Sequence, residues 1–331
     1  MDTIEQANQI FIENWGREVY YGRCIFLSWY CERGTCKFCF RSTIHHKVKH
    51  AKSAKRSMAS ILVEAVLAKK FGWNIEFLTG GYGIYPFAEL LEIIQNVNKV
   101  IGKKVWVNLG AFTKEQLEQL KPYAEGICAS IETAEENLHD EICPDKPIKP
   151  YSEMLKTAKE MGFKTSIAII IGLGEKNTEL LHNFIKEHQL DRITFYALKP
   201  VKGTIFENKQ GPTTEYYTDW IAKTRIKFPK LEIIAGTTAR RYKEAETLFR
   251  VGANAITKFP ATKLFGTEQA QAVEEGAKKA ERTFKGTLTK LPDIDWDKEV
   301  DSLELDSKLK EQLKEKLKQY LDSMENNIKN K

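Results

Sequence analysis

Eight short apolar runs alternate along the chain with longer stretches whose apolar residues recur at helical spacing. The runs span residues 23–30, 74–79, 104–110, 126–132, 164–171, 191–197, 231–236 and 251–258. They are rich in Ile, Val, Phe and Trp, which is typical of parallel strands buried on both faces. Strand–helix repeats predict an α/β fold, and eight of them favour a closed TIM-type (β/α)8 barrel. An open doubly wound sheet is the alternative.

The two ends of the chain differ from this repeat. We divide the sequence into an N-terminal helical segment at 1–22, a barrel at 23–290 and a charged C-terminal helical extension at 291–331. In the extension, four leucines between 309 and 321 recur every four residues and therefore share one helix face. This pattern predicts a helix packed on the outside of the barrel, with a partner-binding helix as the alternative.

Composition and charge exclude several classes of protein. With 42% hydrophobic residues the chain is not disordered, and no run reaches the about 20 apolar residues of a membrane span. The first residues lack the pattern of a secretory signal, so we expect a cytoplasmic protein without a membrane partner. Its six cysteines are then metal-binding, catalytic or core thiols rather than a disulfide framework.

The net charge of +6 suits an anionic ligand. The basic stretch 45–52 lacks interleaved aromatic residues and a recognised nucleic-acid motif. We interpret it as a loop beside an anionic small-molecule substrate and expect no nucleic-acid partner.

Three cysteines, Cys31, Cys36 and Cys39, lie within nine residues directly after the first predicted strand. In a TIM barrel this position belongs to the catalytic face. Thiolates are the usual ligands of iron–sulfur clusters, and three thiolates on a four-iron cluster leave one iron open. A zinc site with His45 or His46 as fourth ligand, in a scaffold or RNA-binding protein, is the alternative.

This cysteine motif, with the aromatic Phe38 directly before Cys39, resembles that of the radical S-adenosylmethionine (SAM) enzymes. The resemblance implies that Cys31, Cys36 and Cys39 hold a [4Fe–4S] cluster whose open iron is chelated by SAM. The gaps here are four residues and then two, whereas three and then two are common in the family.

The same resemblance implies SAM contacts after the second and fourth strands. Gly80 and Gly81 match a family motif that holds the amino group of SAM, although Tyr82 stands where Glu is common. Only the backbone role of the two glycines therefore carries over. Ser130 and Glu132 alternate onto one face of the fourth strand, where relatives contact the ribose of SAM. An ion pair of Glu132 with a surface lysine, or its use as a general base in a metal-free barrel, remains open.

Two further segments match family positions. Lys146 and Lys149 follow the fourth strand, where relatives place a cation for the SAM carboxylate, and Lys149 is our assignment. Gly172 and Leu173 follow the fifth strand, which approaches the adenine of SAM in the family. Solvated lysines are the alternative at Lys146 and Lys149, and an ordinary glycine turn is the alternative at Gly80 and Gly81.

The substrate side of the barrel offers weaker candidates. Arg240 and Arg241 follow the seventh strand, where a guanidinium suits a carboxylate substrate, although a helix-start arginine on the exterior is the alternative. Lys258 ends the eighth strand and has the same two interpretations, a substrate contact or a cation on the exterior. Cys143 lies in a loop on the catalytic side and, with Arg240, is our candidate for direct contact with the substrate.

Within the superfamily the chain resembles the biotin synthase-like group. Sulfur insertion there needs a second cluster, and the matching ligand positions hold Leu78, Trp106 and Ser166. Cys24 and Cys128, placed low in their strands, are interpreted as core thiols. Biotin synthesis is therefore not expected, and a lipoyl synthase-like sulfur-inserting enzyme remains as the alternative.

The cysteine motif on this barrel looks most like the maturases of the [Fe]-hydrogenase guanylylpyridinol cofactor. That resemblance implies an oxygen-sensitive enzyme in which a 5′-deoxyadenosyl radical takes hydrogen from a small cofactor precursor. It also implies a low-potential electron donor such as ferredoxin or flavodoxin.

Overall fold

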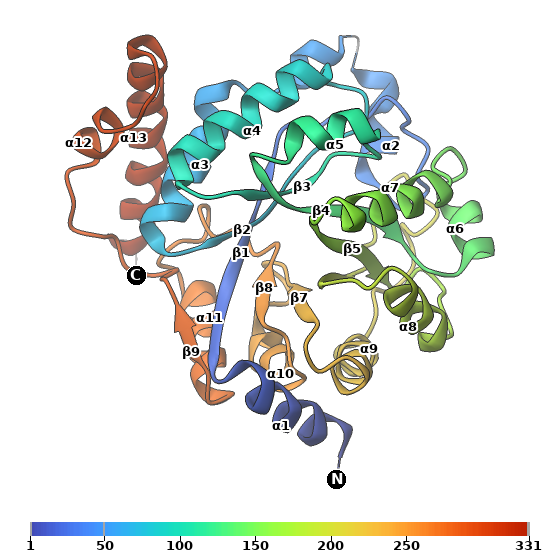
Figure 1. The fold of residues 1–331 in the computed structure, drawn as a ribbon. Coiled ribbons are helices and arrows are strands. Elements are labelled where there is room, and N and C mark those ends of the chain that lie inside the picture. Colours follow the sequence, from blue (N-terminus) through green and yellow to red (C-terminus); the bar gives the residue numbers. More distant parts are fainter. Residues whose placement is uncertain (1, 49, 330–331) are drawn as a thin grey trace.

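The computed structural model, which describes residues 2–48 and 50–329, is a closed barrel of eight parallel strands surrounded by helices (Figure 1). The strands run in the order β2 to β8 and then β1, and pairing of β1 with β2 closes the barrel. The strands are β1 (Glu18–Phe26), β2 (Asn74–Thr79), β3 (Val105–Asn108), β4 (Ala124–Glu132), β5 (Lys164–Ile171), β6 (Arg192–Ala197), β7 (Glu232–Gly236) and β8 (Ala255–Thr257). The TIM-type barrel is confirmed, and the open sheet is excluded.

Helices cover the outside of the barrel and both ends of the chain. They are α1 (Thr3–Trp15), α2 (Phe40–Ile44), α3 (Met58–Phe71), α4 (Phe87–Ile101), α5 (Lys114–Leu120), α6 (Glu136–Ile142), α7 (Lys149–Glu160), α8 (Thr178–Glu187), α9 (Thr214–Lys227), α10 (Ala245–Arg250), α11 (Glu268–Lys279), α12 (Trp296–Asp301) and α13 (Ser307–Lys329). Their ends follow local chemistry: α3 begins after Ser57, whose hydroxyl accepts from the Ser60 amide, and ends at Gly72 in the left-handed conformation.

The first strand differs from the prediction. It begins at Glu18 rather than at residue 23, and residues 27–30 already leave the barrel. Val19 and Tyr21 bury the outer face of this earlier segment, and a short unpredicted strand, β9 (Thr283–Lys285), pairs with it. The N-terminal helical segment therefore ends before residue 18 instead of at residue 22.

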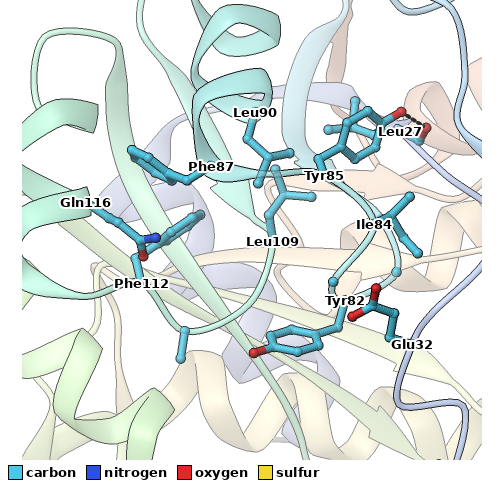
Figure 2. A pocket seen from close by; sticks show the side chains of 14 residues that line it. Leu27, Glu32, Tyr82, Ile84, Tyr85, Phe87, Leu90, Leu109, Phe112 and Gln116 are labelled. Carbon is cyan, nitrogen blue, oxygen red and sulfur yellow. Dashed lines mark hydrogen bonds between the residues drawn. The ribbon is translucent and has the colours of Figure 1, made fainter. Parts of the chain in front are cut away.

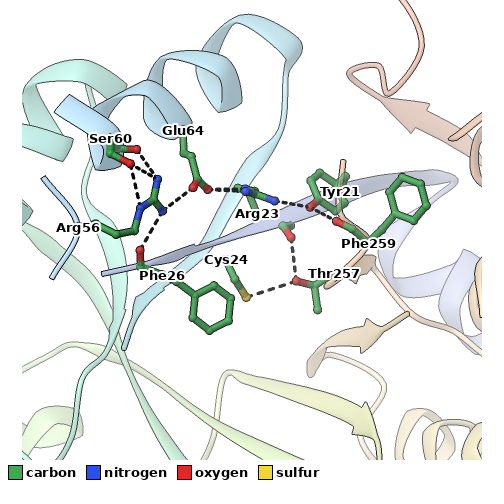
Figure 3. Close-up of polar contacts among 10 residues, drawn as sticks. Tyr21, Arg23, Cys24, Phe26, Arg56, Ser60, Glu64, Thr257 and Phe259 are labelled. Carbon is green, nitrogen blue, oxygen red and sulfur yellow. Dashed lines mark hydrogen bonds and ion pairs between the residues drawn. The ribbon is translucent and has the colours of Figure 1, made fainter. Parts of the chain in front are cut away.

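A buried polar network fixes the end of β1, where the cysteine loop starts (Figure 3). Arg23 donates to Glu64 of α3 at 2.7 Å, and Arg56 holds the other oxygen of that carboxylate at 2.5 Å. Arg56 also donates to the carbonyl of Phe26 at 2.9 Å. Because both cations share one carboxylate, α3, the end of β1 and the segment before α3 are held together.

The C-terminal extension packs on the barrel as predicted. Leu313, Leu317 and Met324 of α13 are buried, and α13 lies along α3 (Figure 1). Leu309 and Leu321 are partly buried against the same core. Among the helices of the described residues, none combines the length and apolar character needed to cross a membrane.

Candidate functional site

A cavity of about 220 Å³ opens at the carboxyl ends of the barrel strands. Three cysteines line it together with five other residues predicted from the sequence: Cys31, Cys36, Cys39, Phe38, Gly80, Gly81, Ser130 and Glu132. Ligand sites of TIM barrels lie at this face. The fold therefore brings most of the predicted site into one place.

The cysteine loop is built against the loop that follows β2. A methyl group on Gly81 would lie 1.5 Å from the carbonyl oxygen of Tyr30, so any side chain there is excluded. The next amide, that of Tyr82, donates to the sulfur of Cys31 at 3.3 Å. The glycine allows a close backbone approach that directs a hydrogen-bond donor at a thiol.

The thiols of the loop lie among cations and a fourth thiol. Arg33 and Arg41 line the same cavity. A hydrogen bond with Cys143 lowers the pKa of the Cys36 thiol, while burial raises that of Cys39. Cys143 is buried behind Cys36 and does not line the cavity, so its predicted contact with the substrate is not supported.

The donor set fits an iron–sulfur cluster better than a zinc ion. The ring of His45 stacks on Tyr30, and its Nε2 lies 3.1 Å both from the Tyr30 hydroxyl and from the carbonyl of Glu32. Across residues 2–48 and 50–329, no three His, Cys, Asp or Glu side chains converge as ligands of one ion. Zinc bonds of about 2.0–2.3 Å require such convergence, whereas thiolates spaced around a cavity suit a larger cluster.

A buried ion pair forms one wall of the cavity. The ammonium of Lys146 donates to Glu132 at 2.6 Å, and both side chains are about nine-tenths buried. Burial opposes the charge of Lys146, but the groups around it, with the carboxylate of Glu132 foremost, together outweigh burial and raise the pKa of Lys146. Lys149 is instead 84% exposed at the start of α7, beside Glu153. Lys146 therefore lines the cavity and Lys149 does not, so the predicted SAM contact of Lys149 is not supported.

Asn108, which sequence analysis missed, lies beside Ser130. Its amide donates to the Ser130 hydroxyl at 2.9 Å, across the ends of β3 and β4. The available signal was a polar residue at the end of an apolar strand. The pair presents a donor and an acceptor at the cavity wall.

Gly172 and Leu173 do not line the cavity. The carboxylate of Glu175 accepts from the amides of Gly172 at 2.7 Å and Gly174 at 3.1 Å, so the loop folds back on itself. Leu173 is buried next to Cys143. Ile170, earlier in the same strand, lines the cavity instead.

The part of the cavity over the barrel interior is aromatic and carries the ammonium group of Lys258. Phe26, Phe77 and Tyr196 line it, and the ammonium of Lys258 lies 4.3 Å from the ring centre of Phe26 and 4.9 Å from that of Tyr196. Lys258 and Glu132 adopt positive φ angles of 65° and 62°. Such strained backbone in residues other than glycine clusters at functional sites.

Below the cavity, the buried carboxylate of Glu76 accepts hydrogen bonds from neutral side chains. Glu76 accepts from Cys24 at 2.6 Å, from Thr194 and Tyr196 at 2.9 Å each, and from Thr257. Cys24 is the seventh of the nine residues of β1, so its expected place at the start of this strand and the bottom of the barrel is wrong. Burial raises the pKa of Cys24, which stays protonated.

The arginines after β7 do not reach the cavity. Arg240 is exposed, and Arg241 is held by Glu244 and the carbonyl of Pro212. Neither arginine is among the residues that line the cavity, so the suggested role of Arg240 in substrate contact is not supported. Lys258, directly after β8, does line it.

A second cavity of about 240 Å³ shares Gly80, Gly81 and Tyr82 with the first (Figure 2). Leu27, Phe87 and Phe112 line it, together with the polar side chains of Glu32 and Gln116. The Tyr85 hydroxyl on its wall already donates to the carbonyl of Leu27 at 2.6 Å. We assign no ligand to it.

Comparison with known families identifies the chain. Residues 27–185 match the model of the Radical SAM superfamily, and residues 194–282 match the Biotin and Thiamin Synthesis associated domain. The chain belongs to the radical SAM superfamily. It is thus a radical SAM enzyme, and its cofactors are those of the family, a [4Fe–4S] cluster and SAM.

Individual relatives cover most of the chain. An uncharacterized protein of Methanocaldococcus jannaschii is 38% identical over 294 residues, which are 88% of this chain and 81% of that protein. The [FeFe] hydrogenase maturase subunit HydE of Thermotoga maritima is 28% identical over 76% of this chain and 72% of its own. The crystal structure of HydG, a maturase of the [FeFe]-hydrogenase, superposes with a TM-score of 0.70 at 15% identity, covering 97% of this chain and 82% of that one. This last likeness concerns the fold.

Proposed function

We propose that this radical SAM enzyme acts on a small anionic precursor in metallo-cofactor biosynthesis, with maturation of the [Fe]-hydrogenase pyridinol cofactor as the specific pathway. When bound, the cluster and SAM supply a 5′-deoxyadenosyl radical that abstracts a hydrogen atom from the substrate. The observation that carries the proposal is the composition of the cavity. Three thiols line one side of it, and aromatic rings with the cation of Lys258 line the other.

In this proposal the cysteine side holds the cofactors. Cys31, Cys36 and Cys39 bind the cluster, and the backbone at Gly80 and Gly81 faces the amino group of SAM. The Tyr82 amide supports the Cys31 thiolate, because a hydrogen bond to a charged acceptor is stronger than one to a neutral acceptor.

The opposite wall holds the rest of SAM. Lys146, oriented by Glu132, offers its remaining donors to the SAM carboxylate. Ser130 and Asn108 face the ribose hydroxyls, for which they provide both a donor and an acceptor. Phe38 covers the cluster loop. The aromatic rings exclude water from the reacting atoms.

The substrate proposal rests on the interior end of the cavity. Phe26, Phe77 and Tyr196 suit a planar ring, and Lys258 supplies a positive charge for an acidic substituent. The cysteines of the barrel interior, Cys24 and Cys128, do not line the cavity, which supports chemistry on a single cluster. We place this chemistry in the cytoplasm, where thiols stay reduced.

The test is 5′-deoxyadenosine release from SAM by anaerobically reconstituted protein under dithionite. A hydroxypyridine carboxylate is expected to accelerate this release several-fold over the substrate-free rate, and Lys258→Met is expected to abolish the acceleration. An octanoylated peptide serves as the contrasting substrate. If it alone accelerates release and is converted to a thiolated product, the sulfur-inserting alternative replaces our proposal.

A further inference from the structure

The positive charge of the chain is concentrated beside the cysteine loop. Residues 37–56 contain seven lysines and arginines and no acidic residue. Since the whole chain has a net charge of +6, the remainder is slightly acidic. The SAM cavity accounts for Arg41 alone among these seven residues. The other six need a separate explanation.

Internal ion pairs account for only part of this charge. Lys55 pairs with Glu89 at 2.5 Å, and Arg56 pairs with Glu64. Lys47 and Lys52 are exposed, and neither forms an ion pair with any residue that the structure describes. Their ammonium groups therefore face solvent, although holding like charges close together is electrostatically unfavourable.

The loop between β6 and α9 brings further cations to the same place. Its backbone at Gly203 touches α2, since a methyl group there would lie 3.2 Å from Thr43. Phe206 is buried in the cluster of side chains that includes Cys36 and Phe38, which anchors the loop beside the cysteines. Lys202 and Lys209 of this loop are exposed and, within the described part of the chain, have no acidic partner.

Two exposed apolar side chains accompany these four lysines. Phe40, which directly follows Cys39, is 36% exposed, and Ile205 is 54% exposed. Apolar residues within a charged surround are the usual composition of a protein docking surface. We define the basic patch as Phe40, Lys47, Lys52, Lys202, Ile205 and Lys209.

We propose that the basic patch docks a small acidic electron-carrier protein that reduces the cluster. The inference rests on the proposed function, in which Cys39 is a cluster ligand. One electron leaves the reduced carrier and enters the cluster, and no proton or atom is exchanged. Because Phe40 is the residue next to Cys39, a carrier seated on it lies close to the cluster. Lysine charges around the contact steer an acidic partner and raise its rate of association.

An RNA strand is the competing polyanion. Of the six residues of the basic patch only Phe40 has an aromatic ring, whereas proteins that bind single-stranded nucleic acid stack successive bases on several rings. The apolar pair Phe40 and Ile205 favours a folded protein surface.

The test measures binding first and electron transfer second. Isothermal titration with an acidic bacterial ferredoxin is made at about 25 and 200 mM salt, where screening differs most. Lys202→Glu/Lys209→Glu is compared with Lys308→Glu/Lys318→Glu, which makes the same charge change on the exposed face of α13, on the other side of the molecule from α2 (Figure 1).

We expect the patch variant to weaken ferredoxin binding at low salt at least tenfold, and Ile205→Ala to weaken it several-fold. The α13 variant should bind like the wild type. SAM cleavage driven by ferredoxin should fall in parallel, while cleavage driven by dithionite stays unchanged in every variant. Equal ferredoxin binding by wild type and patch variant overturns the proposal, as does binding of poly(U) in place of ferredoxin. Absence of dithionite-driven cleavage in the wild type would instead contradict the proposed function.

Discussion

Replacing Gly81 by alanine tests how the fold presents the cysteine loop. The added methyl group would lie 1.5 Å from the carbonyl oxygen of Tyr30, 2.4 Å from its carbon and 2.7 Å from the Cα of Cys31. Real contacts of this kind are not shorter than about 3.0 Å, so the two backbones must separate by about 1.5 Å. Overpacking costs about 1–3 kcal/mol where side chains can adjust, and here the obstacle is backbone.

The separation would move Cys31 away from Cys36 and Cys39 and would lengthen the 3.3 Å contact from the Tyr82 amide to the Cys31 sulfur. We therefore expect Gly81→Ala to retain its far-ultraviolet circular dichroism but to lose most of the iron and sulfide bound on reconstitution. Gly80→Ala is the matched control, because its methyl group would make only ordinary contacts of 3.5 Å or more. Equal iron content in the two variants would refute this reasoning.

Three further outcomes are expected. Lys146→Met should abolish SAM binding measured by titration. It should also lower the free energy of unfolding by about 3–5 kcal/mol, because it leaves the buried carboxylate of Glu132 unpaired. Lys149→Met should match the wild type in both measurements. Leu313→Ala should lower the free energy of unfolding in urea by about 2–5 kcal/mol, because this side chain of α13 is fully buried. An unchanged free energy would mean that α13 does not pack on the barrel core. Burial lowers the pKa of His182 and of His188, so the unfolded chain binds their protons more tightly than the folded chain does. The free energy of unfolding should therefore fall as pH drops below about 6.5. In a His182→Gln/His188→Gln variant it should depend less steeply on pH.

The barrel itself was predictable from sequence because its strands are continuous apolar runs. The first strand was misplaced because its true start, residues 18–22, includes the charged Glu18 and the glycine Gly22, which interrupt an apolar pattern. Only the pairing of this segment with β8 and β9 shows that it belongs to the sheet. The short strand β9 was missed for a similar reason, since its pairing with β1 is not encoded in its own three residues.

The site was predictable where residues act through their position in a motif. The three cysteines, the two glycines and the Ser130–Glu132 pair all line the cavity. The choice between Lys146 and Lys149 was not predictable, because a shift of three residues decides between burial against Glu132 and exposure at a helix start. Lys258 was already a candidate at the end of the eighth strand, but its position beside Tyr196 was not predictable, because their proximity comes from barrel closure.

The central claim is that Cys31, Cys36 and Cys39 hold one cluster that cleaves SAM. The most direct measurement is iron and acid-labile sulfide per chain after anaerobic reconstitution, with 5′-deoxyadenosine release under dithionite, for the wild type and the Cys31→Ala/Cys36→Ala/Cys39→Ala variant. We predict about four irons and measurable release in the wild type, and neither in the variant. Zinc in place of iron, or iron retained by the variant, would contradict the account.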